Sequence, residues 1–163
     1  MDFAVDPIDA ALVTATIANG LLAGVFFVFS VAVSPGFRRV DDRTYVRSFR
    51  AINAAILNGM FLTVFIVAPL AAVVSITLQL WHGDPTSLPW IAAGAVCSVL
   101  SFGITALGNV PLNRELERSP ITSDQDCRAA RRRFEGRWNR WNFARTLSSS
   151  GALILFAVSL SLG

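Results

Sequence analysis

Seven polar side chains lie at the ends of long apolar segments, where they could form one binding site. Most of them come in pairs three or four residues apart, the spacing that places two side chains on one face of a helix. We therefore expect the pairs to face a shared space. The seven residues are Arg50, Asn53, Asn109, Asn113, Trp138, Asn142 and Arg145.

Arginine and amide side chains donate hydrogen bonds, so this set could hold the oxygen atoms of a ligand and stabilise a negative charge that develops there. The apolar walls of such a pocket would come from the segment GVFFVFS, residues 24–30, and from the tryptophans. The same polar residues also suit a structural role, in which they end helices, reach the membrane surface and cross-link the bundle. The residues by themselves leave both interpretations open.

Four apolar segments carry these side chains. The chain has 163 residues, of which 53% are hydrophobic and 15% charged, and its mean hydropathy is +0.54. The segments cover approximately residues 10–34, 51–80, 88–108 and 143–162; the first three contain no charged residue and the fourth contains only Arg145. Each has the roughly 20 residues needed to cross a bilayer. The sequence predicts an all-α, transmembrane, up-down four-helix bundle, with residues 1–163 forming a single integral membrane domain and helices two and four extending into the cytoplasm.

The distribution of positive charge predicts the topology. All 14 basic residues are arginine; five lie in residues 38–50 and nine in residues 114–145. Residues 81–87 and both termini contain none. By the positive-inside rule, a multi-pass protein of the cell membrane with this pattern has cytoplasmic arginine-rich loops and both termini outside. The isoelectric point near 9.6 then indicates contact with anionic membrane lipids, and we expect no nucleic-acid partner.

Capping and turn residues predict where the helices begin and end. Asp6-Pro7 is typical of a helix start, and Pro35-Gly36 of a helix end. Asp41 or Asp42 can cap a second helix, which we expect to run without a break into its apolar segment. Pro111 is expected to break the third helix. Residues 122–126 offer capping side chains for the fourth, which we expect to start outside the membrane.

The residue inventory argues against bound metals and common cofactors. His82 is the single histidine, and the apolar segments contain no carboxylate, so neither a bis-histidine haem nor a carboxylate-bridged di-iron site can form within one chain. No nucleotide-binding glycine motif occurs in a suitable context. Cys97 and Cys127 fall at different depths, which disfavours a disulfide. We expect no metal and no cofactor.

Gly20 and Gly24 form a GxxxG pattern in the first apolar segment. This spacing permits close contact between membrane helices. The pattern favours packing within the bundle, and a homo-oligomer is the alternative.

Several motifs resemble those of the anthrone-oxygenase-like family of small four-helix membrane proteins. They are GLLAGVFFVFSVAVSPG, AIN, NVPLN and RWNRWNFART, which occur in this order along nearly the whole chain. The resemblance implies an oxygenase that converts an anthrone-type methylene to a quinone carbonyl with molecular oxygen, without a conventional metal or flavin.

In such a reaction the arginines and amides would stabilise a phenolate or enolate of a lipophilic aromatic substrate. A general base is missing from the seven residues. Tyr45, Asp41 and Asp42 are the nearest titratable candidates. Two hypotheses follow: an oxidoreductase that acts on an anthrone- or hydroquinone-like compound in a cytoplasm-facing pocket, or a non-enzymatic membrane protein that binds lipid or a partner membrane protein.

Overall fold

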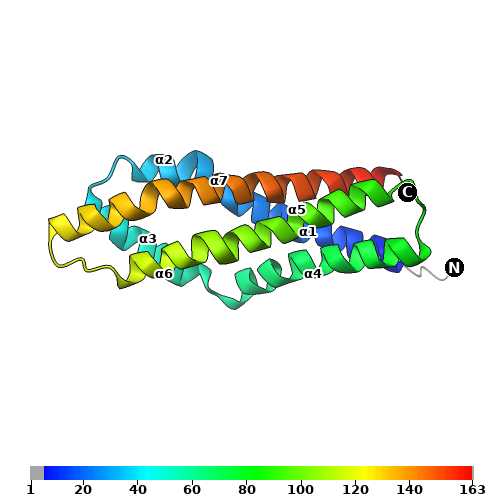
Figure 1. The fold of residues 1–163 in the computed structure, drawn as a ribbon, viewed down its shortest axis with the longest axis horizontal. Coiled ribbons are helices and arrows are strands. Elements are labelled where there is room, and N and C mark those ends of the chain that lie inside the picture. The colour runs from blue at the N-terminus through cyan, green and yellow to red at the C-terminus, as the bar shows by residue number, and fades with distance from the viewer. Residues whose placement is uncertain (1–5, 163) are drawn as a thin grey trace.

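The computed structural model describes residues 6–162, which form helices and short connections without a strand. The molecule is an elongated bundle of four long helical rods, of which the second spans only part of the length (Figure 1). The first comprises α1 (Pro7–Val28), the π-helical turn η1 (Phe29–Val33) and α2 (Ser34–Phe37). The second is α4 (Gly59–His82); the third comprises α5 (Leu88–Ile104), the π-helical turn η2 (Thr105–Asn109) and α6 (Val110–Arg118). The fourth is α7 (Asp124–Leu162), and a shorter helix, α3 (Asp42–Ile56), connects the first two rods.

The four rods pack as an up-down bundle. Helix α1 contacts α4 and α7, and α5 contacts the same two helices, so that neighbours run antiparallel. All four rods are long and apolar enough to cross a membrane. The predicted all-α four-helix bundle is therefore confirmed.

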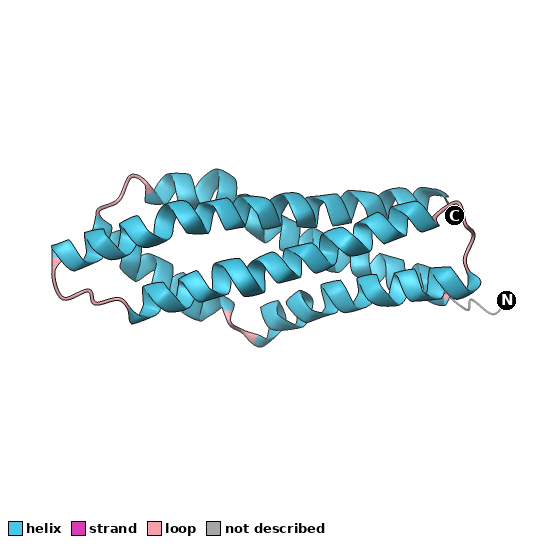
Figure 2. Cartoon of the chain, viewed as in Figure 1, coloured by secondary structure: helices cyan, strands magenta, loops and turns pink. Residues whose placement is uncertain are grey.

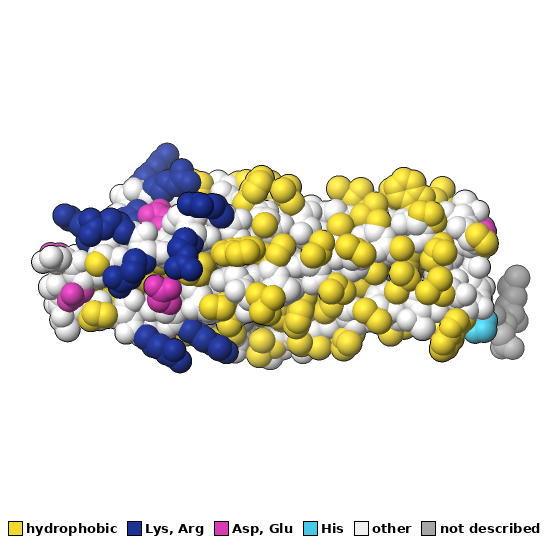
Figure 3. Space-filling view, viewed as in Figure 1, with side chains coloured by type: hydrophobic (Ala, Val, Ile, Leu, Met, Phe, Trp, Pro, Cys, Tyr) yellow, Lys and Arg dark blue, Asp and Glu magenta, His cyan; other side chains and the backbone are white. Residues whose placement is uncertain are grey.

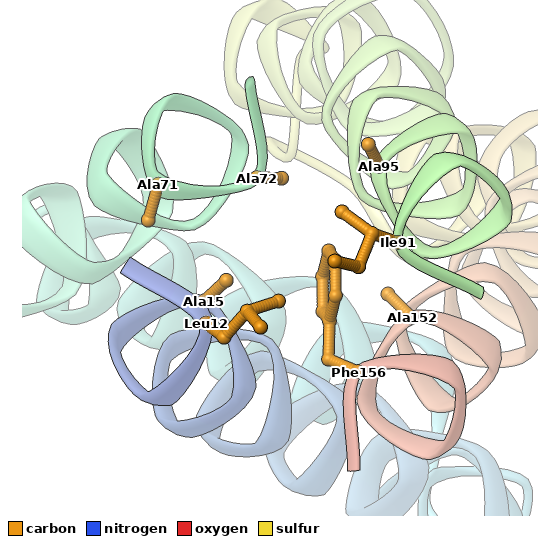
Figure 4. Packing of buried hydrophobic residues seen from close by; sticks show 8 residues of the cluster. All are labelled: Leu12, Ala15, Ala71, Ala72, Ile91, Ala95, Ala152 and Phe156. Atoms are coloured by element: carbon orange, nitrogen blue, oxygen red, sulfur yellow. The ribbon is translucent and has the colours of Figure 1, made fainter. Parts of the chain in front are cut away.

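Small side chains let these helices approach closely at the end of the bundle where both chain termini lie (Figure 1). Ala15, Ala72 and Ala152 have no exposed surface, and Phe156 fills the space between the rods beside Ile91 (Figure 4). In a membrane, where apolar surface gains little by leaving lipid, such close packing holds helices together. The opposite face of the helices exposes large apolar side chains over most of the length, a surface that suits lipid contact (Figure 3).

The arginines gather at the other end of the molecule (Figure 3). There, α3, α6 and the first half of α7 pack around buried aromatic side chains, including Phe49, Phe134 and Trp138. Phe49 lies 4.7 Å from Phe134 and 4.8 Å from Trp138, measured between ring centroids. This aromatic core fixes α3 against α7 and so positions the residues at the C-terminal end of α3.

Several predicted caps are present. The Asp6 side chain accepts a hydrogen bond from the Ile8 N–H, with Pro7 in the first turn. Asp41 caps α3 by accepting from the Thr44 N–H at 2.9 Å. At the start of α7, Asp126 and Ser123 each accept a hydrogen bond from the other's backbone N–H.

The prediction of one unbroken second helix is wrong. Leu57 and Asn58 leave the helical conformation, and Asn58 accepts a hydrogen bond from the Phe61 N–H, so that it caps a new helix, α4 (Figure 2). Asn-Gly is a strong turn dipeptide because both residues readily leave the helical conformation. The break makes α3 a separate helix outside the apolar part of α4.

Two predicted helix ends are also wrong. The first rod continues past Pro35-Gly36 to Phe37. Pro111 does not break the third rod, whose backbone stays helical from Leu88 to Arg118. The preceding turn is π-helical: the Val110 N–H donates to the Thr105 carbonyl, five residues back.

Candidate functional site

The structure divides the seven polar residues into two groups joined by Trp138. One group lies inside the bundle around α7; with Ser30 and Thr146 it forms what we call the inner polar layer, made of Ser30, Asn109, Asn142, Arg145 and Thr146. The other group borders a surface cavity between α3 and α6, called the outer groove, and comprises Arg50, Asn53 and Asn113.

Two π-helical turns supply residues of the inner polar layer. Ser30 lies in η1 and Asn109 in η2, and both turns pack against α7. A π-helical turn adds one residue to a helical turn and so rotates the side chains that follow it; such turns are frequent at functional sites. The chain thus has an irregular turn on each of two rods at the part of α7 that carries Asn142 and Arg145.

Asn142 is the centre of this layer and is fully oriented by its hydrogen bonds. Its Nδ2 donates to the Ser30 hydroxyl at 2.8 Å and to the Phe26 carbonyl at 3.1 Å. Its Oδ1 accepts two hydrogen bonds from the Arg145 guanidinium, at 3.0 and 2.9 Å. Thr146 completes the layer with a contact of 3.2 Å to the Ser30 hydroxyl.

Arg145 is a buried cation without an acidic neighbour. Its exposed fraction is 7%, and among residues 6–162 no carboxylate oxygen lies within ion-pair distance of its guanidinium. The guanidinium carbon instead lies 4.0 Å from the centroid of the Phe26 ring and 5.2 Å from that of Trp138. Because a buried charge is costly unless it is paired, this arrangement favours negative charge nearby.

Asn109 is also buried, with no exposed surface. Its Nδ2 donates to the Trp138 carbonyl at 3.3 Å, whereas its Oδ1 has no hydrogen-bond partner. Buried polar atoms are nearly always paired, so an unpaired acceptor next to Trp138 is unusual.

The outer groove has a volume of about 590 Å³. Its walls are mainly apolar and its polar groups are few, which is the usual composition of a small-molecule site. It opens beside the break between α3 and α4, where Leu57 is 66% exposed. The lining residues are Arg50, Ala51, Asn53, Ala54, Ile56, Leu57, Val110, Asn113, Arg114 and Glu117.

The polar residues of the groove differ in how they are satisfied. The Asn53 Nδ2 is buried and has no partner. The Asn113 Oδ1 accepts a hydrogen bond from the Trp138 indole N–H at 2.8 Å. Arg50 donates to the carbonyls of Leu116 and Ser119, and thereby satisfies the C-terminal end of α6. Asn53 is thus a residue of the groove lining whose buried side-chain donor has no protein partner.

Trp138 links the two groups. Its indole N–H binds Asn113 in the groove, while its ring lies 5.2 Å from the Arg145 guanidinium. The sequence-based expectation of one shared space therefore corresponds to two adjacent groups, with the aromatic ring between them.

The three titratable residues named from the sequence make structural contacts. Asp41 caps α3, and its hydrogen bonds with the Thr44 hydroxyl and N–H lower its pKa. Asp42 pairs with Arg131 at 3.2 Å. Tyr45 is 1% exposed in the aromatic core. Its pKa is raised mainly by burial and, to a smaller extent, by the negative charge of Glu135.

Glu117 in the outer groove was missed by sequence reasoning. A signal was present, since Glu117 follows Asn113 by four residues and therefore shares its helix face.

Within residues 6–162, no cluster of three or more His, Cys, Asp or Glu side chains is placed to hold a metal ion.

Four apolar rods with a polar layer and a groove at one end define a multi-pass membrane protein. The anthrone oxygenase family model matches residues 47–155. This match begins within α3 and ends within α7, and it includes the residues of the groove, Trp138, Asn142 and Arg145. The chain belongs to the anthrone oxygenase family. Searches among curated proteins and among solved structures found no significant match.

Proposed function

We propose that this protein is a membrane oxidoreductase that binds a lipophilic phenolic compound of the anthrone or hydroquinone type in the outer groove and oxidises it with molecular oxygen. The observation that carries the proposal is the unpartnered, buried Asn53 amide in a mainly apolar cavity of about 590 Å³. A mainly apolar cavity lined by a few hydrogen-bond donors suits a flat aromatic molecule that presents an oxygen atom.

Positive charge beside the groove supports the chemistry. Arg114 lines it, and Arg145 lies beyond Trp138 without a carboxylate partner. Positive groups near a phenol favour its anion. The anion of an anthrone tautomer is electron-rich and can transfer electrons to oxygen, so the protein assists the reaction by stabilising that anion.

The proposed orientation places the arginine-rich end in the cytoplasm and both chain ends outside the cell membrane. The segregation of arginines at one end of the bundle supports this orientation. The outer groove would then lie at the cytoplasmic boundary, where a membrane-dissolved compound could reach it.

The test measures binding and oxidation with protein purified in detergent. Binding of a hydroxyanthraquinone is followed by tryptophan fluorescence, and anthrone oxidation by absorbance and oxygen uptake, against the rate without protein. We expect Asn53→Ala to weaken binding about tenfold, since it removes one hydrogen bond, and to leave the unfolding temperature unchanged because the Asn53 Nδ2 has no protein partner.

Asn139→Ala is the matched control. Asn139 accepts a hydrogen bond from the Ser34 hydroxyl at 2.8 Å and does not line the groove. We expect this variant to lower the unfolding temperature and to keep the ligand affinity. If the wild-type protein neither binds the hydroxyanthraquinone nor accelerates anthrone oxidation, the enzymatic proposal is wrong and the non-enzymatic alternative, binding of lipid or a membrane partner, takes its place.

A further inference from the structure

Almost all carboxylates at the arginine-rich end bind another group of the protein. Two act as helix caps, and the others form ion pairs with arginines at distances between 2.8 and 3.8 Å. The carboxylates with such a partner are those of Asp41, Asp42, Glu115, Asp124, Asp126 and Glu135.

Glu117 is the exception. Within the described part of this end, it is the one carboxylate with neither an ion pair nor a hydrogen bond to the protein. Glu117 lies on an exposed part of α6, at the edge of the outer groove. No arginine nitrogen of the described residues lies within ion-pair distance of its carboxylate.

The Glu117 carboxylate lies in the lining of the outer groove. It lines the outer groove together with Asn53, Asn113 and Arg114. The groove is thus lined on α3 by Asn53, whose buried Nδ2 has no protein partner, and on α6 by the exposed Glu117 carboxylate, which has no ion pair. The charged groups that share the groove with Glu117 are Arg50 on α3 and Arg114 on α6.

We propose that Glu117 is the general base of the oxidation, the catalytic residue that removes a proton from the methylene carbon of the bound substrate. This inference rests on the proposed function and adds to it the group that the sequence did not identify. A base must lie within hydrogen-bond reach of the proton that it removes, and Glu117 borders the space that the substrate would occupy.

The reaction balances with molecular oxygen as the oxidant. The Glu117 carboxylate takes one proton from the methylene carbon, and the electron pair of the broken C–H bond spreads over the ring to the substrate oxygen, which is held by Asn53. The carbon then transfers electrons to oxygen and forms a C–O bond, and the resulting peroxide takes the proton back from Glu117. Loss of the second C–H proton and cleavage of the O–O bond give the carbonyl and one molecule of water.

The experiment compares Glu117→Gln with Glu115→Gln in the full-length protein. Glu115 lies on the same helix but pairs with Arg133 and Arg137 and does not line the groove. A general base contributes about 10²- to 10⁴-fold to rate. We expect Glu117→Gln to lower kcat by at least about 100-fold, to leave hydroxyanthraquinone affinity within about twofold, and to change the dependence of kcat on pH. Glu117→Asp should restore part of the rate.

Deuterium at the substrate methylene gives an independent measurement. We expect a larger isotope effect on kcat in Glu117→Asp than in the wild-type protein, because a misplaced base makes proton removal more strongly rate-limiting. The inference is overturned if Glu117→Gln oxidises anthrone at the wild-type rate with the same pH profile, or if Glu115→Gln loses as much activity. Absence of binding and turnover in the wild-type protein would instead overturn the proposed function, so the two failures are distinguishable.

Discussion

Replacing Arg145 with methionine should reduce activity without destabilising the protein. Arg145 is the one charged side chain among residues 6–162 that is buried, and its hydrogen-bond acceptor is a neutral amide, Asn142. A buried ion without a counter-ion can be replaced by an apolar side chain of similar size at little cost, because the lost hydrogen bonds are offset by the desolvation penalty that is removed. We expect the free energy of unfolding to change by less than about 2 kcal/mol.

The effect on the groove follows from distance. Trp138 lies 5.2 Å from the Arg145 guanidinium and 2.8 Å from Asn113, which places the charge on the order of 10 Å from a ligand in the groove. At that separation and an effective dielectric constant of about 20, a unit charge contributes about 1.7 kcal/mol. This energy corresponds to roughly one unit in the pKa of a bound phenol.

A hydroxyanthraquinone whose colour reports ionisation measures this effect directly. In Arg145→Met, the pKa of the bound dye should rise by about one unit, since the positive charge that favours the anion is gone, and anthrone turnover at neutral pH should fall about tenfold. Thermal unfolding in detergent gives the stability.

Arg131→Met is the control, because Arg131 pairs with Asp42 and Glu135 and donates to the carbonyls of Val40 and Phe37. It should cost about 3 kcal/mol of stability and leave the pKa of the dye unchanged. An unchanged pKa of the bound dye in Arg145→Met would refute the electrostatic role; a loss of stability as large as that of Arg131→Met would show that Arg145 is structural.

Two further predictions concern the elements that position the site. Gly108→Ala in η2 should lower stability by about 1–3 kcal/mol, because a Cβ at this position would come within 2.6 Å of the Trp141 ring. Gly103→Ala is the control and should leave stability unchanged, because a Cβ there would have no atom within 4 Å. Thermal unfolding of the two variants measures the difference. The pKa of Asp41 is lower in the folded protein than its ordinary value of 3.8. The cap therefore stabilises α3 above that pH, and this stabilisation is lost as the pH falls through the folded pKa. The stability of Asp41→Asn should lack this dependence on acid pH, and identical profiles of stability against pH for the variant and the wild-type protein would contradict the assignment.

Local signals in the sequence predicted the elements of the fold. Apolar length is sufficient to predict the four rods, since about 20 uncharged residues cross a bilayer wherever they lie in the chain. Asp6 and Asp41 predicted helix starts for a similarly local reason, because a cap bonds to a backbone N–H two or three residues away.

The helix irregularities could not be predicted in the same way. The Asn58-Gly59 break lies inside an apolar run whose length predicted one helix, and the capping tendency of Asn58 prevailed where α3 packs on the aromatic core. The turns η1 and η2 lie against α7 and have no sequence pattern that distinguishes them from ordinary helix. They change the direction of the side chains that follow, so helical spacing alone could not assign their partners.

The sequence by itself determined that this is a four-rod membrane protein with arginines at one end, because hydrophobicity and charge act residue by residue. The tertiary structure decided how the polar residues are used. It buried Arg145 beside the neutral Asn142, left the Asn53 amide unpaired in a groove, and left Glu117 without an arginine partner. Each of these outcomes depends on contacts between residues far apart in the chain, whose distances only the packed bundle defines.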